Sequence, residues 1–117
     1  MGTWSYNVLD NDEALDLLGE FNESMDISIL EMVLDAVSRQ KSTDSIEAPL
    51  AQRAIAAAKI ISDLNEEQIS TAKKDGLLRK ADKALRRILE TSELKGLWAD
   101  SPEYDAWTKA VESLLIG

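Results

Sequence analysis

Apolar residues fill almost every position of one stretch near the middle of the chain, residues 48–64. On a helix, its few polar side chains would leave most of the circumference apolar, and such a helix must be surrounded by others. Alanine, the commonest residue there, has the highest helix propensity and lets neighbouring helices approach closely. Pro49 fits the first helical turn, where no N–H donor is needed. The pattern predicts the central helix of an all-α domain.

On either side of this segment, apolar residues recur every three to four positions, as in amphipathic helices that pack against a core. This periodicity predicts a compact single-domain bundle (residues 1–117) with a docked N-terminal arm over 1–9. We expect Asp26 or Ser24 to cap the second helix and Gly76 to interrupt the chain before the fourth. The bundle comprises five main helices, 12–21, 27–40, 48–64, 77–89 and 102–115, plus one or two short ones, 66–72 and 91–99.

Large side chains on the terminal helices are assigned to the core. The first helix is expected to bury one face, made of Ala14, Leu15, Leu17, Leu18 and Phe21. Aromatic residues near both ends of the chain fit inward helical faces or the docked arm, so core packing explains them better than a ligand pocket does. These residues are Trp4, Trp98, Tyr104 and Trp107.

The 117-residue chain has a net charge of −9, and the whole surplus lies in its first third. Residues 1–35 contain nine acidic residues and no basic one, whereas residues 36–117 contain 22 − 9 = 13 acidic residues and 13 basic ones. Acidic residues four apart on a helix repel each other slightly, so a stripe of them suggests a binding face. Such a surface attracts basic proteins and repels nucleic acid, although solubility alone also explains it. We expect the contact surface to consist of Asp12, Asp16, Glu20, Glu23, Glu31 and Asp35.

Eight of the 13 basic residues cluster between positions 73 and 95 and give that segment a net charge of +4. A basic helix can contact nucleic acid, but here the overall charge is negative and no aromatic residues are interleaved for base stacking. A solvated helix face, or ion pairing with the acidic first third, explains the segment better. We therefore expect no nucleic-acid partner.

The chain contains neither Cys nor His. It therefore lacks disulfides, thiolate chemistry and the commonest general base and metal ligand. The acidic run 10–13 lacks the Gly turn and distal Glu of a calcium loop, and helix capping accounts for it. Carboxylates on exposed helix faces lack the cleft that acid–base catalysis requires. We expect no enzymatic activity, no cofactor and no metal.

No apolar run reaches the roughly 20 residues that span a bilayer, and the N-terminus lacks the basic flank and apolar core of a signal peptide. The absence of cysteine fits a reducing compartment. These observations predict a cytoplasmic protein with no membrane partner.

Three segments together resemble a known family. The chain has MGTW (1–4) and LDND (9–12) in its opening segment, AIAAAKII at 54–61, and ADKALRRILETSELKGLWADSPEYDAW at 81–107. This arrangement resembles an uncharacterised bacterial domain family whose members open with Met-Gly-Thr-Trp-Gly, then Phe-Asp-Asn-Asp, and contain an alanine-rich middle helix. Ser5 and Leu9 depart from the usual Gly and Phe, but neither replaces a reactive group. The resemblance implies no activity; small acidic proteins of this style are similar to immunity proteins that neutralise bacterial toxins.

The function expected from charge and resemblance is non-enzymatic binding. In this hypothesis the chain is an immunity protein of the contact-dependent inhibition type, and its carboxylates bind a basic toxin, with a nuclease as the expected class, by mimicking phosphates. The alternative is a stand-alone structural or regulatory helical protein with no toxin partner, whose acidic residues serve solubility. One version of this alternative is a homodimer. An enzyme is the weakest hypothesis, because no spacing arranges the remaining reactive groups.

Overall fold

The computed structural model describes residues 12–40, 46–90, 92, 96, 98–99, 101–102 and 104–115. Five helices make up most of this part of the chain: α1 (Asp12–Ser24), α2 (Ile27–Ser38), α3 (Ala48–Asp63), α4 (Thr71–Glu90) and α6 (Tyr104–Glu112). Among the described residues no strand forms, and Ile46 and Ser92 make one isolated parallel β-bridge. The predicted all-α single-domain fold is confirmed. The expected N-terminal arm, with Trp4, lies outside the described residues.

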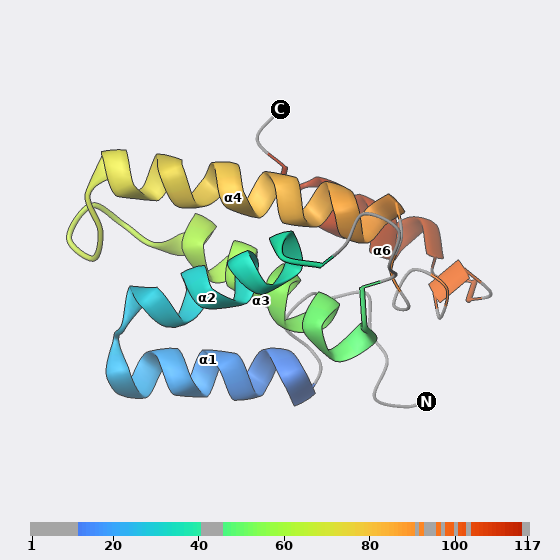
Figure 1. The fold of residues 1–117 in the computed structure, drawn as a ribbon, viewed down its shortest axis with the longest axis horizontal. Coiled ribbons are helices and arrows are strands. Elements are labelled where there is room, and N and C mark those ends of the chain that lie inside the picture. Colours follow the sequence, from blue (N-terminus) through green and yellow to red (C-terminus); the bar gives the residue numbers. More distant parts are fainter. Residues whose placement is uncertain are drawn as a thin grey trace.

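The alanine-rich helix α3 lies at the centre of the bundle and contacts α1, α2 and α4 (Figure 1). Its small side chains let these helices pack close to its backbone. In Figure 1, α1 runs along the lower edge of the molecule and α4 along the upper edge, with α2 and α3 between them. The buried residues of α3 are Ala51, Ala54, Ile55, Ala56, Ala57, Ala58, Ile60 and Ile61.

Two local features form the short turn between α1 and α2: a left-handed backbone conformation and a helix cap. Met25 adopts a left-handed backbone conformation with φ of 52°, and its N–H donates to the carbonyl of Phe21. Asp26 then caps α2, since its carboxylate accepts hydrogen bonds from the Ser28 backbone N–H (3.0 Å) and hydroxyl (2.7 Å). Of the two predicted caps, Asp26 is the one used. Ser24 supports it by accepting the Asp26 N–H at 3.2 Å.

The Asp26 cap makes stability depend on pH in a defined direction. Hydrogen bonds from the Ser28 side chain and backbone lower the pKa of Asp26 below its ordinary value of 3.8. The ionised cap therefore stabilises the fold fully above the unfolded pKa, and this contribution is lost as the pH falls through the folded pKa. We predict that Asp26→Ala is less stable than the wild type at pH 7 in urea unfolding and that the difference in stability narrows as the pH falls below the ordinary value of 3.8 and through the lower folded pKa. A gap that stays constant down to pH 2 would contradict this role; Glu23→Ala serves as the exposed control.

The sequence prediction for residues 66–89 was wrong in two respects. Residues 66–70 form a turn instead of starting a helix, because the Asn65 side chain accepts the backbone N–H groups of Glu67 and Gln68. Gly76 lies inside α4 instead of interrupting it. Ser70 accepts the Lys73 N–H at 3.3 Å, as an N-cap does, so the helix begins at Thr71. The helix continues through Gly76 because the residues that follow bury one apolar face, and this packing outweighs the low helix propensity of one glycine.

Gly76 is exposed, and a β-carbon added there would meet no atom within 4 Å. Because glycine in a helix interior is about 1 kcal/mol less favourable than alanine, Gly76→Ala should raise the free energy of unfolding by about that amount. Urea unfolding monitored by circular dichroism would measure this change. An unchanged or lowered midpoint would show that this turn of α4 is not formed in solution.

The other helix boundaries in the structure differ from the predicted boundaries by a few residues. α1 extends three residues beyond the predicted end at Phe21, α2 ends at Ser38, and α6 is shorter than the predicted 102–115. Within the predicted short helix 91–99, positions 96, 98 and 99 are helical, and the other positions are not described apart from Ser92.

Of the four aromatic residues predicted to pack in the core, Trp98, Tyr104 and Trp107 lie in the described part of the chain, and these three pack together. The ring centroids of Trp98 and Trp107 lie 6.1 Å apart, Tyr104 stacks on Trp107 at 6.2 Å, and both tryptophans are buried. This cluster attaches α6 to the bundle, where α6 contacts α4.

Candidate partner-binding surface

The 13 residues of α1 include five acidic residues and no basic one. Its apolar residues Ala14, Leu17 and Phe21 are buried on the side that packs on α3. The other side of the helix is exposed and carries four carboxylates, which we call the α1 acidic face. Its members are Asp12, Asp16, Glu20 and Glu23.

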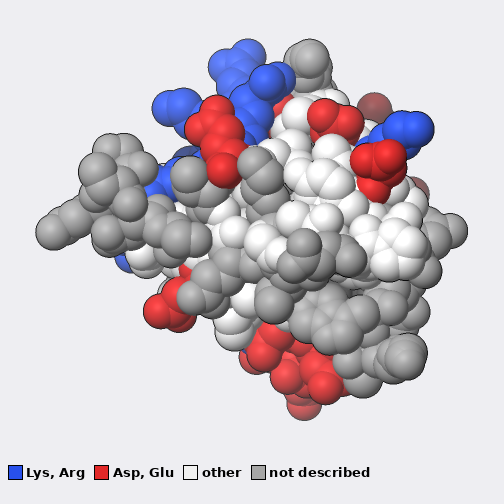
Figure 2. Space-filling view, turned by 90° about the vertical axis from the view of Figure 1, so that its right-hand side faces the viewer, with Lys and Arg blue, Asp and Glu red and all other residues white. Residues whose placement is uncertain are grey.

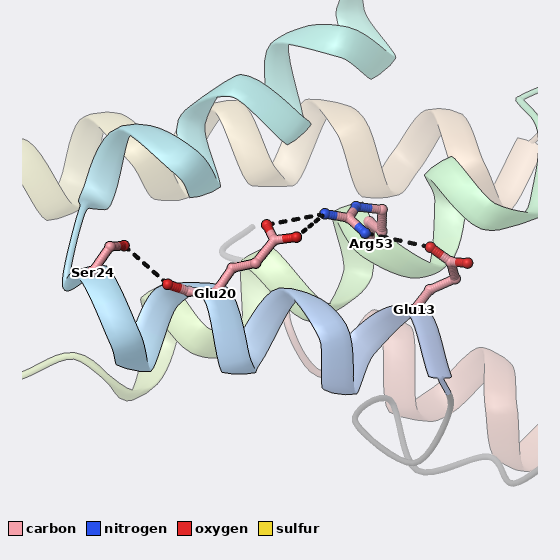
Figure 3. Close-up of polar contacts among 4 residues, drawn as sticks. All are labelled: Glu13, Glu20, Ser24 and Arg53. Atoms are coloured by element: carbon pink, nitrogen blue, oxygen red, sulfur yellow. Dashed lines mark hydrogen bonds and ion pairs between the residues drawn. The ribbon is translucent and has the colours of Figure 1, made fainter.

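One cation from α3 partly compensates this charge (Figure 3). The Arg53 guanidinium lies 3.4 Å from the Glu13 carboxylate and 3.3 Å from that of Glu20, so it bridges two turns of α1. These groups are partly exposed, and ion pairs at such sites contribute about 0–1 kcal/mol each. Among the described residues, no Lys or Arg lies within ion-pair distance of Asp12, Asp16 or Glu23.

The two acidic residues predicted on the second helix have a different setting. Lys80 of α4 lies 2.7 Å from the Glu31 carboxylate and 3.2 Å from that of Asp35. Hydrogen bonds to Glu31 and Asp35 raise the pKa of Lys80. The structure thus brings four of the six predicted contact residues together on α1 and joins the other two, on α2, to α4.

The basic helix α4 uses much of its charge within the molecule. The Lys74 ammonium donates to the carbonyls of Ser62 and Leu64 at the end of α3. The Arg87 guanidinium donates to the Gln40 carbonyl at 2.6 Å. The Arg86 guanidinium pairs with Asp82 on the same helix. Together with Lys80, four of the seven basic residues of α4 have internal partners, and for Lys80 the predicted pairing with the acidic first third is observed.

The acidic charge of α1 is set apart from the basic side chains of α4. Figure 2 shows a group of acidic side chains along the lower edge, on the side of α1, with no basic side chain visible among them, whereas basic and acidic side chains are mixed along the upper edge, on the side of α4. Because α2 and α3 lie between these edges, the charges of α4 do not neutralise the α1 acidic face (Figure 1). A ligand approaching from the side of α1 meets a predominantly acidic surface, in which Arg53 pairs with Glu13 and Glu20 on one flank.

Two features beside this face were not predicted. Leu15, which was assigned to the core, is 53% exposed, because the buried arc of α1 is centred on Ala14, Leu17 and Phe21 and turns Leu15 toward solvent. A shallow pocket of about 170 Å³ also opens next to α1, between that helix, the end of α3 and the following turn. The residues that line it are Leu18, Phe21, Asn22, Ile60, Asp63, Leu64 and Gln68. Periodicity could not reveal this pocket, because its walls come from three segments.

The described residues contain neither a metal-binding cluster nor a membrane-spanning helix. None of the groups of acidic side chains there is arranged to hold a metal ion. In the same part of the chain, every helix is too short or too polar to cross a bilayer.

Comparison with known proteins identifies the family. The sequence model of a family described as a domain of unknown function (DUF4259) matches residues 2–110, and the chain therefore belongs to this family. No curated protein and no solved structure showed significant similarity.

Proposed function

We propose that this DUF4259 member is a non-enzymatic binding protein whose α1 acidic face docks on a basic protein. The observation that supports this proposal is the exposure of Asp12, Asp16 and Glu23 without a neighbouring cation in the described structure. A surface that serves solubility alone mixes charges of both signs, whereas the edge formed by α1 shows acidic side chains with no basic side chain visible among them (Figure 2). Segregation of this kind suits a partner of opposite charge.

The partner class that best suits this surface is a bacterial toxin with a basic cleft, such as a nuclease. A nuclease holds its substrate through Lys and Arg side chains directed at phosphates, and carboxylates spaced along one helix can occupy the same groups. Complementary charge also raises the association rate, which benefits a protein that must reach a toxin before its substrate is cut. In this proposal the chain is an immunity protein that acts in the bacterial cytoplasm, in keeping with the absence of cysteine.

Affinity capture tests this proposal. The tagged chain would be incubated with lysate of the encoding organism and washed at low and moderate salt, and the retained proteins would be identified by mass spectrometry. A stoichiometric basic partner whose nuclease activity the chain suppresses is the expected result. If no partner is retained under conditions that express toxin genes, the proposal fails, and a concentration-independent dimer in sedimentation would favour the structural or regulatory alternative.

A further inference from the structure

The pocket beside α1 has the size of one amino-acid side chain. Leu18 and Phe21 of α1 and Ile60 and Leu64 at the end of α3 form its apolar walls. Its volume of about 170 Å³ is small beside the roughly 300–1,000 Å³ of pockets that enclose whole small-molecule ligands. It therefore suits a single apolar side chain presented by a larger partner.

Polar residues form the rim of this pocket, and an ion pair and a hydrogen bond hold them in place. Asp63 is held by an ion pair with Lys59 at 3.2 Å. The Gln68 side chain accepts the Asn65 N–H at 3.1 Å, which ties the turn after α3 to the pocket. The pocket is thus an apolar floor within a polar rim, the arrangement found around buried anchor residues at protein interfaces.

The pocket and the uncompensated carboxylates share α1. Successive residues of a helix are about 100° apart, so Glu13 and Glu20 lie on one flank of the α1 acidic face, where Arg53 binds them. The opposite flank leads through the exposed Leu15 and Gly19 to the pocket residue Leu18. A β-carbon added at Gly19 would meet no atom within 4 Å, so a partner chain can pass close to the helix there.

We propose that this pocket receives one apolar side chain, of the size of leucine or phenylalanine, from a basic segment of the partner, while neighbouring Lys or Arg side chains contact the α1 acidic face. This inference rests on the proposed function and adds an anchor to it. The carboxylates accelerate the encounter, and the buried anchor slows dissociation.

Two synthetic peptides of equal charge test the inference. One carries a phenylalanine flanked on each side by two lysines, and the other carries serine in place of the phenylalanine. We expect the phenylalanine peptide to bind about tenfold more tightly in NMR titrations, since burying most of an aromatic side chain strengthens binding by at least that factor. We also expect it alone to shift the methyl signals of Leu18, Ile60 and Leu64. Equal affinities, undetectable binding of both peptides, or unmoved methyl signals would overturn the inference.

A matched pair of variants locates the effect. Asn22→Trp places a bulky side chain at the rim of the pocket and should reduce the affinity for the phenylalanine peptide to that for the serine peptide. Ala72→Trp adds the same side chain at an exposed position of α4 and should leave both affinities unchanged. Equal effects of the two variants would overturn the inference.

The outcomes separate the two proposals. If both peptides bind equally and only through α1, the anchor pocket fails while a basic partner for α1 stands. If affinity capture finds no basic partner but the phenylalanine peptide still fills the pocket, the proposed function fails and the subsite stands.

Discussion

Simultaneous replacement of Asp12, Asp16 and Glu23 with lysine should slow association with the captured basic partner about 100-fold at low ionic strength. These side chains are exposed and lack a cation within ion-pair distance in the described structure, so no neighbouring described cation weakens their attraction for a basic partner. Stopped-flow kinetics over a salt series measures the effect. The wild-type and variant rates should converge near 1 M salt, where the screening length is about 3 Å.

A matched control variant distinguishes the effect of where the charges lie from the effect of the net charge on the association rate. Replacement of Asp75, Asp105 and Glu112 with lysine also changes the net charge from −9 to −9 + 6 = −3, but at exposed positions of α4 and α6. This control should retain most of the wild-type rate. If both triple variants slow association equally, total charge governs the encounter and the assignment to α1 is wrong.

The largest stability effect is expected at the centre of the bundle. Ile61 of α3 is fully buried, and Ile61→Ala removes part of the core while leaving helix propensity slightly improved. The expected loss in the free energy of unfolding is about 2–5 kcal/mol, which comes from lost burial and from the cavity left behind. Urea unfolding followed by circular dichroism measures it.

The control for this variant is Met32→Ala on α2. Met32 is 67% exposed, so its removal should change the free energy of unfolding by no more than about 0.5 kcal/mol. A loss below about 1 kcal/mol for Ile61→Ala, or losses of similar size for the two variants, would contradict the central position of α3.

The parts of this fold that could be predicted are those that a short window of sequence determines. The alanine-rich composition of α3 and the apolar periodicity of its neighbours require several helices around a central one, and Asp26 caps α2 through a contact two residues away. Gly76 was misassigned because its local propensity for a break is overridden by the buried face of α4. Leu15 was misassigned because it lies at the edge of the buried arc, where periodicity does not decide exposure.

The candidate site could be predicted only in part. The acidic residues of α1 can be identified from the sequence, but the basic residues that form ion pairs with acidic residues cannot. Arg53 reaches Glu20 across 33 residues, and Lys80 reaches Glu31 across 49. Which carboxylates stay uncompensated therefore depends on how α3 and α4 pack, and the pocket likewise depends on where α1 crosses the end of α3.

The most direct test of the binding face is amide hydrogen exchange of the wild-type chain, free and saturated with its captured basic partner. The account predicts that the added protection is concentrated in residues 12–24 and in the turn that lines the pocket, with little change in α4 and α6. Protection concentrated in α4 or α6, with α1 unchanged, would show that the partner binds elsewhere and would contradict the assignment of the α1 acidic face.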